Sequence, residues 1–591
     1  MHNIVNPRQT QLFDPFGTVL TAKTRKRLLD GWPGIFRHVI LELMPVNTVS
    51  GHFDPTMGRP TKELYSIAGL LLIKEFMNWK KDEALDAYSF NLNIHYALNL
   101  EPVAHDISMR TLERYIALFE EDDIAKTIMS DVTIKLVDLL DISIDKQRLD
   151  STHIFSDMAS FGRTRLMGVA IKRFLTQVMR HDEPGYNALN ESLRTRYAPG
   201  VNQLFADTKK DSESRRLLRD QVAEDMYYLV RHFSDKAEHN NRDTYKALER
   251  IFYEQCEVHE DKVSVKQKTG GNCMQNPSDA GATYDGHKGS GYQAQLAETC
   301  DPQNEAQLIT SVIPQTAAQS DGAAVKEVLD DLDANNLMPN ELLVDTAYAG
   351  DDNVELAEEK GVELVGPVPS GKTRDNEYER LNIDDFDVDD AAEEVVCCPA
   401  GHKPESSEHN SETGKTKTVM PQSACGHCEY FEQCPVEKTC GEYRLDHTAK
   451  GRRLEGRRRE QDTEVFRERY KIRGGIEGTN SGLKRKTGLG QLRVRGRPAV
   501  FHAIYLKVAG WNILRAAVCA KMRQIVWERA RKAAFWLYFA FLRMKTAAKN
   551  VLRDVIRRFL LCCRNLRSFR SPVLPSGQTF DVGVNNTQAV L

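Results

Sequence analysis

Two aspartates stand directly after strand-like segments of the chain. Asp150 follows the alternating stretch Ile142–Leu149, and Asp345 follows the apolar run Leu342–Val344. A carboxylate at the carboxyl end of a strand projects into the crevice where α/β sheets hold their ligands. A single aspartate of this kind is weak evidence, since helix capping explains most of them. Two of them in one mixed α/β pattern favour an acidic site at the edge of a sheet.

A third acid lies in the segment Tyr470–Lys484, which follows the pattern Y-x2-R-x3-E-x6-K. On a helix, Arg473 and Glu477 are one turn apart and Lys484 is two turns further on, so all three share a face beside Tyr470. One acid, two cations and an aromatic ring on that face would hold a metal ion beside phosphates. The alternative is an ordinary i,i+4 ion pair on an exposed helix. Because all four positions match downstream of two strand-ending aspartates, we expect Glu477 to join them in one site.

Three carboxylates of this kind suit the hydrolysis and transfer of phosphodiesters. Asp150, Asp345 and Glu477 offer only hard oxygen ligands, which select Mg²⁺ or Mn²⁺. Such a triad can hold two ions about 3.5–4 Å apart with the scissile phosphate between them. This chemistry requires neither Ser nor Tyr as a nucleophile, so we assign Tyr470 to phosphate contact rather than to nucleophilic attack.

With these motifs, the chain resembles the DDE transposases of bacterial insertion sequences, which carry the Y-x2-R-x3-E-x6-K signature. Further local matches are DSTHI around Asp150, SDAGATYDGHKGSGYQAQLAETC at Ser278–Cys300, and VDTAYAGDDN around Asp345. The resemblance runs from about His52 to Asn512, which is most of the chain. It implies an RNase H-like catalytic fold that cuts and joins double-stranded DNA.

The resemblance also implies a role for each motif residue. The catalytic and metal-binding acids would be Asp150, Asp345 and Glu477. Contacts to the DNA at the ends of the mobile element would come from Tyr470, Arg473 and Lys484. Because two element ends must be brought together, we expect a homodimer or a higher homo-oligomer on DNA.

The elements that must position these residues form a mixed α/β pattern. Further strands are predicted at Gly291–Thr299, Leu308–Pro314 and Val362–Val365. Helical spacing predicts helices at Thr61–Met77, Lys81–Leu98, Met109–Phe119, Ile124–Leu140 and Asp321–Leu332. We therefore predict an α/β fold whose core is a mixed sheet flanked by helices, which the resemblance makes RNase H-like.

The chain of 591 residues is too long for one hydrophobic core, so we expect about three or four domains or large insertions. The predicted parts are a helical N-terminal domain (1–125), a first part of the core (126–368) with a helical insertion (about 161–260), a cysteine-rich insertion (369–450), a second part of the core with the Glu477 helix (451–520), and a basic helical tail (521–591). The N-terminal helices suit a helix-turn-helix module for DNA and a plain helical bundle about equally well.

The insertion after Pro369 carries a cysteine cluster with metal-ligand spacing. A C-x2-C knuckle with a further cysteine on each side is typical of a structural four-cysteine zinc site. The chosen ligands are Cys398, Cys425, Cys428 and Cys434, with Cys397, His427 and Cys440 as substitutes. The alternative is a set of free cysteines in a polar loop. Zinc is favoured because so small a segment with few apolar residues would struggle to fold without metal.

The charge is distributed unevenly along the chain. The formal net charge is −4, yet the stretch Gly441–Arg570 holds roughly 33 Lys and Arg against roughly 10 Asp and Glu. Such a basic block is typical of a surface that binds nucleic acid, and the alternative is a solvated helical face. Further predicted DNA contacts are Lys486, Arg493 and Arg495, beside Lys484. For the tail Met522–Phe569 we prefer DNA or subunit contact, with membrane-surface binding a remote option.

The start of the chain has no basic segment followed by an apolar run, so no secretory signal is expected. The apolar run Ala533–Leu542 is shorter than the ~20 residues that span a bilayer. The 12 cysteines are therefore expected as thiols or metal ligands. These features predict a cytoplasmic protein on the bacterial nucleoid, without a membrane partner.

The leading hypothesis is a transposase that cuts element ends and joins their 3′-hydroxyls to target DNA, with two Mg²⁺ or Mn²⁺ ions and a structural Zn²⁺. A second hypothesis is a DNA-binding regulator derived from a transposase. A third is a metal-dependent nuclease without strand transfer, which the triad alone does not separate from the first.

Overall fold

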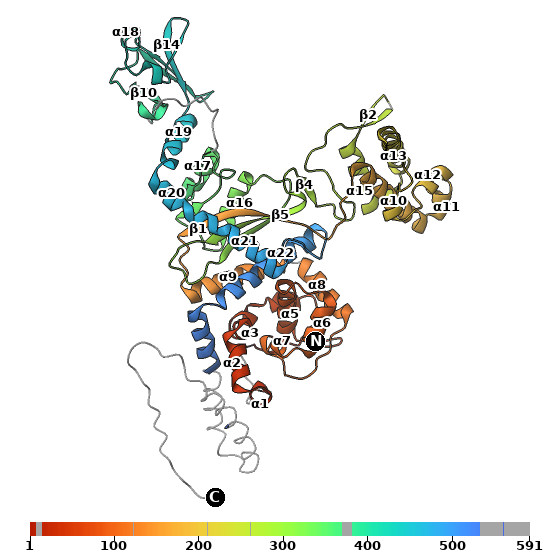
Figure 1. The fold of residues 1–591 in the computed structure, drawn as a ribbon. Coiled ribbons are helices and arrows are strands. Elements are labelled where there is room, and N and C mark those ends of the chain that lie inside the picture. Colours follow the sequence, from red (N-terminus) through yellow and green to blue (C-terminus); the bar gives the residue numbers. More distant parts are fainter. Residues whose placement is uncertain are drawn as a thin grey trace, which may run out of the picture.

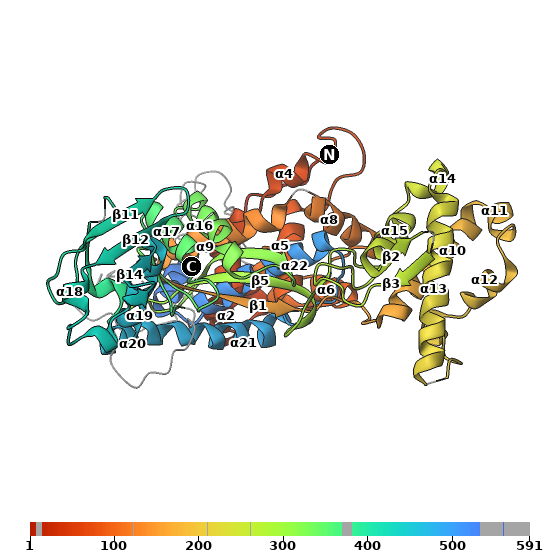
Figure 2. The ribbon, with the colours of Figure 1, turned by 90° about the horizontal axis from the view of Figure 1, so that it is seen from above.

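The computed structural model describes residues 1–7, 15–121, 123–209, 211–260, 262–368, 381–389, 391–531 and 560. It has a mixed α/β core, a bundle of helices on each of two sides, and a small β-rich segment that projects from one end (Figures 1 and 2). Most of the predicted basic tail, residues 521–591, lies outside the described residues.

The core is a six-stranded mixed sheet in which β1 is central. Its strands are β1 (Lys146–Ile154), β4 (Thr283–Asp285), β5 (Gly289–Thr299), β6 (Ile309–Thr316), β7 (Glu341–Leu343) and β8 (Glu363–Val365). β5 runs antiparallel to both β1 and β6, whereas β1, β7 and β8 run parallel to one another. The predicted mixed sheet is therefore present, and the strands expected around residues 291, 308, 342 and 362 all belong to it.

The first strand differs from its prediction. β1 begins at Lys146 and continues to Ile154, so Asp150 lies in the middle of the strand and not after its end. The segment beyond Asp150 stays extended because residues 150–154 pair with β5, as Asp150 does with Leu296. Long-range pairing of this kind is invisible in the local alternation of the sequence.

The register of β1 on β7 sets the two aspartates side by side. Lys146 pairs with Glu341 and Arg148 with Leu343 in a parallel ladder. The same register, continued by two residues, places Asp150 level with Asp345, two residues beyond the end of β7. The edge of β1 beside Asp150 is therefore open, and both carboxylates can face the same space.

Helices α9 (Ile124–Leu140), α16 (Val325–Ala334), α17 (Asp351–Glu359) and α22 (Arg497–Ala516) pack on this sheet, and α5 (Leu64–Phe76) packs on α22. The apolar helix α22 lies between α9, α5 and β6 (Figure 1). The buried amide of Asn512 links α22 to α9 and β6: its nitrogen donates to Thr133 Oγ1 at 2.9 Å and to the Ile309 carbonyl at 2.8 Å. Its oxygen accepts the Ile309 N–H at 2.9 Å.

The N-terminal region is helical, as predicted. Besides α5 it contains α1 (Pro15–Val19), α2 (Ala22–Asp30), α3 (Trp32–Ile35), a π-helical turn (Phe36–Ile40), a 3₁₀ turn (Leu41–Leu43), α4 (Val46–Ser50), α6 (Lys81–Phe90), α7 (Leu92–Ala97) and α8 (Met109–Glu121). The predicted helix Lys81–Leu98 is thus two helices, since the chain bends at Asn91, which caps α7 with its side chain. Apolar side chains of this region join those of α9, α22 and the sheet in one continuous core. A domain boundary at residue 125 stays a prediction.

A buried lysine joins this helical region to the helix that carries Glu477, α21 (Gly475–Thr487). Lys507 on α22 donates through Nζ to the carbonyl of Thr487 at 2.7 Å and to that of Glu75 at 2.8 Å. Nζ also lies 3.7 Å from the Glu75 carboxylate. Burial lowers the pKa of Lys507 to about 8, while Glu75 opposes that shift. The carboxyl end of α21 is therefore fixed against α5 and α22.

The segment between β1 and β4 forms a separate helical unit with its own hydrophobic core. Its elements are α10 (Arg163–His181), α11 (Glu183–Asn187), α12 (Glu191–Arg196), a 3₁₀ turn (Val201–Gln203), α13 (Ser212–Phe233), α14 (Ala237–Asn240), α15 (Asp243–Gln255), β2 (Cys256–His259) and β3 (Lys262–Val265). The unit lies beyond β4, to the right of the sheet in Figure 1. Its place in the chain matches the helical insertion that the sequence predicts at about 161–260.

The cysteine-bearing segment is a second outlying unit with a small core of its own, at the upper left in Figure 1. It contains a 3₁₀ turn (Ile383–Asp385), β9 (Asp387–Asp389), β10 (Glu394–Cys397), β11 (Ser406–Asn410), β12 (Lys415–Met420), α18 (Gln422–Cys425), a 3₁₀ turn (Phe431–Gln433), β13 (Glu437–Thr439) and β14 (Glu442–His447). The chain returns to the core through α19 (Ala449–Gln461) and α20 (Glu464–Tyr470). In Figure 2, α20 and α21 run along one edge of the molecule.

Within the described part of the chain, no single helix has the length and apolar composition needed to cross a membrane, although the bent pair Arg497–Ala516 and Ala520–Arg531 meets those criteria when taken together.

Close packing of α22 on α5 depends on Gly510. A Cβ atom at this position would lie 1.9 Å from Cβ of Phe76, which is buried in the core. We predict that Gly510→Ala lowers the free energy of unfolding by about 1–3 kcal/mol, the usual cost of overpacking. Urea denaturation followed by circular dichroism measures this change.

The matched control is Gly478→Ala on α21, where a Cβ atom meets nothing within 4 Å. Since alanine is the better helix former, this variant should be as stable as the parent or about 1 kcal/mol more stable. Equal losses of unfolding free energy in Gly510→Ala and Gly478→Ala would show that overpacking between α5 and α22 is not the cause of the destabilisation.

Candidate active site

The three acids predicted from the sequence come from three separate segments. Asp150 lies in the middle of β1, Asp345 lies two residues beyond the end of β7, and Glu477 lies in the first turn of α21. The exposed fraction of the side chain rises along this series, from 17% for Asp150 through 37% for Asp345 to 75% for Glu477. The site therefore has a buried side at β1 and an open side at the helix.

One guanidinium group lies among all three acids. The Nη2 atom of Arg473 is 3.0 Å from Oδ1 of Asp150 and 3.6 Å from Oδ2 of Asp345. Its Nη1 atom is 3.9 Å from Oε1 of Glu477. The fold thus brings together residues that are more than three hundred positions apart in the chain. The i,i+4 pair of Arg473 and Glu477 is present, but it belongs to a larger cluster.

The helix that was expected to run through the signature is broken. α20 ends at Tyr470, a 3₁₀ turn covers Lys471–Gly474, and α21 begins at Gly475. The Tyr470 hydroxyl donates to the Val344 carbonyl at 3.0 Å, and its ring stacks on Phe466 at 5.6 Å. Tyr470 therefore supports the backbone just before Asp345. Its contact with DNA stays a prediction.

A buried ion pair fixes the start of α21 onto the sheet. Arg148 of β1 donates from Nε to Oε2 of Glu298 on β5 at 2.8 Å, and from Nη1 to the Ile472 carbonyl at 2.8 Å. The Thr479 hydroxyl donates to the other Glu298 oxygen at 2.6 Å. These bonds hold the chain on both sides of Glu477. Burial raises the pKa of Glu298, and Arg148 and Thr479 oppose that shift.

The same ion pair explains one glycine of the signature. A Cβ atom on Gly475 would lie 2.1 Å from Nη1 of Arg148. Only a residue without a side chain lets α21 approach the sheet while the guanidinium stays between them.

Asp150 has partners that the sequence did not indicate. The Asn480 side chain donates to its Oδ2 atom at 3.1 Å. Burial raises the pKa of Asp150, Arg473 lowers it, and the neighbouring Asp345 and Asp321 raise it. Asn480 stands one helical turn after Glu477, and its position within the signature was the only available signal.

Asp321 and Lys288 both contact Ser151, the residue that follows Asp150 on β1. Asp321 accepts a hydrogen bond from the Ser151 hydroxyl at 3.1 Å and one from the Gln295 amide at 2.9 Å. Lys288 donates to Ser151 Oγ at 2.9 Å and lies 3.5 Å from Asp321. Sequence reasoning missed both residues. Lys288 falls inside the quoted motif GHKGSGYQ, whereas Asp321 looks like an ordinary helix start.

The predicted DNA contacts differ in their surroundings. Lys484 is half-buried, and its pKa is lowered by burial and by Lys288, while Asp150 opposes the shift. Lys484 and Arg493 also line a groove with Lys80 and Asn78 from the N-terminal helices. The remaining predicted contacts, Lys486 and Arg495, are exposed. Both ends of this basic stretch are therefore accessible to a polyanion.

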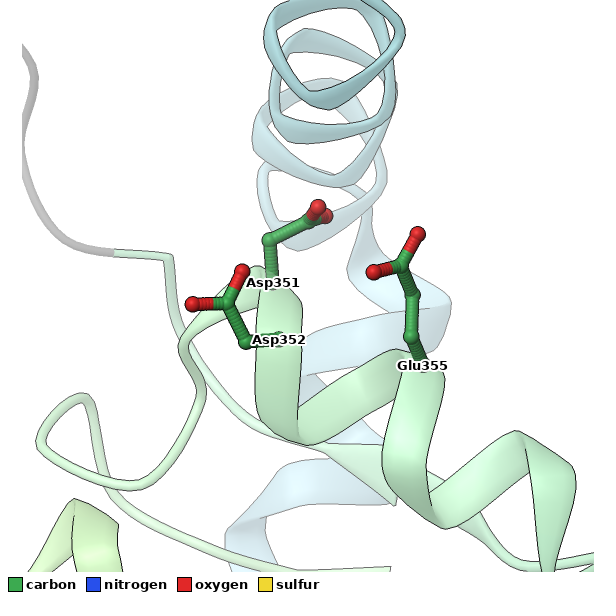
Figure 3. A group of neighbouring side chains, drawn as sticks. All are labelled: Asp351, Asp352 and Glu355. Carbon is green, nitrogen blue, oxygen red and sulfur yellow. The ribbon is translucent and has the colours of Figure 1, made fainter.

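The donor atoms of the triad suit Mg²⁺ or Mn²⁺, since all are carboxylate oxygens. The guanidinium group of Arg473 lies among them, however. Among the described residues, the acids whose ligand atoms all lie within 4.8 Å of one another are Asp351, Asp352 and Glu355 on α17 (Figure 3).

This second acidic cluster has cationic partners of its own. Arg453 lies 2.6 Å from Asp351 and 2.5 Å from Glu355, and Lys450 lies 2.6 Å from Asp352. The charges of the cluster thus attach α17 to α19, which is a structural role.

The four chosen cysteines lie around one small cavity in the outlying β-rich unit. They are Cys398, Cys425, Cys428 and Cys434. Burial raises the pKa of Cys425 to about 11, and its three cysteine neighbours raise it further. His402 also borders the cavity, which the sequence did not suggest. The named substitutes Cys397, His427 and Cys440 do not line it.

The donor set of these cysteines suits Zn²⁺, which prefers four thiolates in a closed site. Their sulfurs are nevertheless absent from the groups of described residues with ligand atoms within 4.8 Å of one another. The predicted ligands are therefore gathered, but they do not form a closed tetrahedral arrangement.

Residues 397–517 match the family model of a transposase DDE domain. The match supports a DDE transposase. It includes the cysteines, Arg473 and Glu477, but neither Asp150 nor Asp345, which the fold itself adds to the site. No curated protein matches the chain.

A cryo-EM structure of a piggyBac transposase synaptic complex with hairpin DNA is 11% identical to the chain, with a TM-score of 0.19. The alignment covers 72% of this chain and 80% of that one. A TM-score this low supports no argument about the fold.

We predict that Arg148→Met destabilises the protein by about 3–5 kcal/mol, because it leaves the buried Glu298 carboxylate without a cation. Urea denaturation measures the loss. The double variant Arg148→Met/Glu298→Leu should recover much of it, since removing both charges removes the unpaired one. If the losses of unfolding free energy from the two single substitutions simply added in the double variant, the ion pair would not be what anchors α21.

Proposed function

We propose that this protein is a DDE transposase of a bacterial insertion sequence, which cuts the ends of its element and joins the 3′-hydroxyls to target DNA. The observation that carries the proposal is the convergence of Asp150, Asp345 and Glu477, from three segments, around Arg473. The alternative, an ordinary surface ion pair of Arg473 and Glu477, would not require Asp150 and Asp345 at the same place.

The core of this transposase is proposed to be RNase H-like. The support is the strand arrangement β6-β5-β1-β7-β8, with β5 antiparallel and the β1, β7 and β8 strands parallel. The acids then lie on the central strand, at the end of its parallel neighbour, and on a helix that covers that edge.

The proposed reaction has two in-line displacements. Water first frees a 3′-hydroxyl at the element end, and that 3′-hydroxyl then attacks a phosphodiester of target DNA. Two Mg²⁺ or Mn²⁺ ions held by the triad would activate the attacking oxygen and stabilise the leaving one. Asn480 and the β1–β5 pairing orient Asp150, the Tyr470 hydroxyl holds the backbone before Asp345, and the Arg148–Glu298 pair holds the start of α21.

Double-stranded DNA is the proposed partner, bound by a homodimer or higher homo-oligomer in the bacterial cytoplasm. The proposed phosphate contacts are Tyr470, Arg473, Lys484, Lys486, Arg493 and Arg495. The groove that Lys484 and Arg493 share with Lys80 supports this assignment, because it combines three cations with a single carboxylate, that of Asp157. The N-terminal helices form one wall of that groove, so they would contact the same DNA.

Two other functions compete with this one. A regulator derived from a transposase would bind the same DNA, yet it would not need three converging acids. A metal-dependent nuclease would cut without joining, and only the products of the reaction separate it from a transposase.

We predict that the full chain, given Mg²⁺ and DNA from the ends of its element, forms strand-transfer products that vanish in Asp345→Asn. Gel analysis of labelled DNA measures cutting and joining separately. Asp352→Asn is the matched control, because Asp352 is an exposed acid of the second cluster and should be dispensable. Cutting without joining would support the nuclease, and binding without cutting would support the regulator.

We also propose that the segment 369–450 holds a structural Zn²⁺ through Cys398, Cys425, Cys428 and Cys434. The support is their common cavity and the small apolar core beside it. The metal would take no part in cutting, since the triad lies in a different unit of the fold.

We predict about one Zn²⁺ per chain by atomic absorption, reduced strongly in Cys425→Ser. Cys440→Ser is the matched control, because Cys440 is exposed and lies away from the cavity, and it should retain the metal. Purified protein without zinc, or equal loss in both variants, would contradict the site.

A further inference from the structure

Arg473 is the feature of the site that the proposed chemistry leaves unexplained. Its side chain is only 13% exposed, although it stands in a segment expected to face DNA. Every ion-pair partner the structure gives its guanidinium is one of the three acids, and its buried Nε atom has no partner. The guanidinium thus lies where the carboxylates converge, held by charge rather than by neutral hydrogen bonds.

The net charge of the site indicates that Arg473 and the two metal ions compete for the three carboxylates. Three carboxylates carry −3, and Arg473 reduces that to −2. Two divalent ions add +4, so the sum with Arg473 becomes +2. Cations that share one small, partly buried site repel each other strongly. Arg473 and the two ions therefore cannot share the acids, unless further negative charge enters the site.

DNA phosphates supply that negative charge. A guanidinium binds phosphate oxygens through a planar fork of donors, as it binds carboxylates. The half-buried Lys484 and the nearby Lys288 already make the surroundings of Asp150 favourable for a phosphate. Arg473 would need only a change of side-chain conformation to move from the acids to a phosphate placed beside them.

We propose that Arg473 is a positioning residue that occupies the acids in the free protein and transfers to a DNA phosphate when divalent ions bind. Metal ions and DNA then bind cooperatively, because each removes an obstacle to the other. The free protein has low affinity for metal, which keeps the nuclease chemistry inactive away from its DNA. This inference rests on the proposed function, since it assumes that the triad binds metal.

The test is a Mn²⁺ titration of the full chain, with free Mn²⁺ followed by electron paramagnetic resonance. Without DNA, Arg473→Gln should bind Mn²⁺ about tenfold more tightly than the parent, within the range typical of coupled sites. Adding a DNA duplex of the element end should tighten Mn²⁺ binding in the parent, and much less in Arg473→Gln. A merely structural arginine would instead weaken metal binding when replaced.

Two more variants complete the design. Arg469→Gln is the matched control, because Arg469 pairs with Glu341 and Glu363 one turn earlier and should not change Mn²⁺ affinity. Arg473→Lys keeps the charge but loses the planar fork, so its Mn²⁺ affinity should lie between those of the parent and Arg473→Gln.

Stability provides a second readout if Arg473→Gln folds poorly. Its melting temperature without metal should fall, because the acids then repel one another, and Mn²⁺ should raise it more than it raises that of the parent. Equal or weaker Mn²⁺ binding by Arg473→Gln, with an equal or smaller melting shift, would overturn the inference. Failure of the proposed metal site is distinguishable, since Mn²⁺ binding would then be unchanged in Asp150→Asn.

Discussion

The position of α21, the helix that carries Glu477, depends on one buried ion pair. Arg148 and Glu298 face each other across β1 and β5, and both are almost fully buried. Two buried charges are costly unless each is paired and hydrogen-bonded, so the chain must supply all their partners. It does so with Thr479 and the Ile472 carbonyl, on either side of Glu477. The requirement to satisfy these charges therefore sets where α21 begins relative to the sheet.

The arrangement of the acids follows from that position and from the strand register. The ladder of β1 and β7 sets Asp150 level with Asp345, and the short β7 leaves the edge of β1 open at that level. The first turn of α21 then places Glu477 beside the two aspartates, while Lys507 holds the carboxyl end of the same helix. Three acids so close together need a cation, which in this structure is Arg473 and in the proposed reaction is a pair of metal ions.

Much of the fold and of the candidate site could be predicted from the local sequence, whereas other parts of both depend on long-range contacts. The strands, the helical N-terminal region and the three acids follow from periodicity and from a short signature. The extent of β1 could not be predicted, because residues after Asp150 stay extended only through pairing with β5. The break at Lys471–Gly474 also escaped prediction, since the turn is bonded to Arg148, a residue far away in the sequence. Asp321 carries no local signal, and the motif around Lys288 does not indicate its role, because only the folded sheet places both residues near Asp150.

The central claim is that Asp150, Asp345 and Glu477 bind metal ions together, rather than the acids of α17. Fe²⁺ with ascorbate and peroxide, added to the full chain with its DNA, cuts the backbone close to bound iron. We expect three sets of cuts, near residues 150, 345 and 477, which Mg²⁺ suppresses and Asp150→Asn removes. Cuts confined to the neighbourhood of Asp351–Glu355, or cuts unaffected by Asp150→Asn, would contradict it.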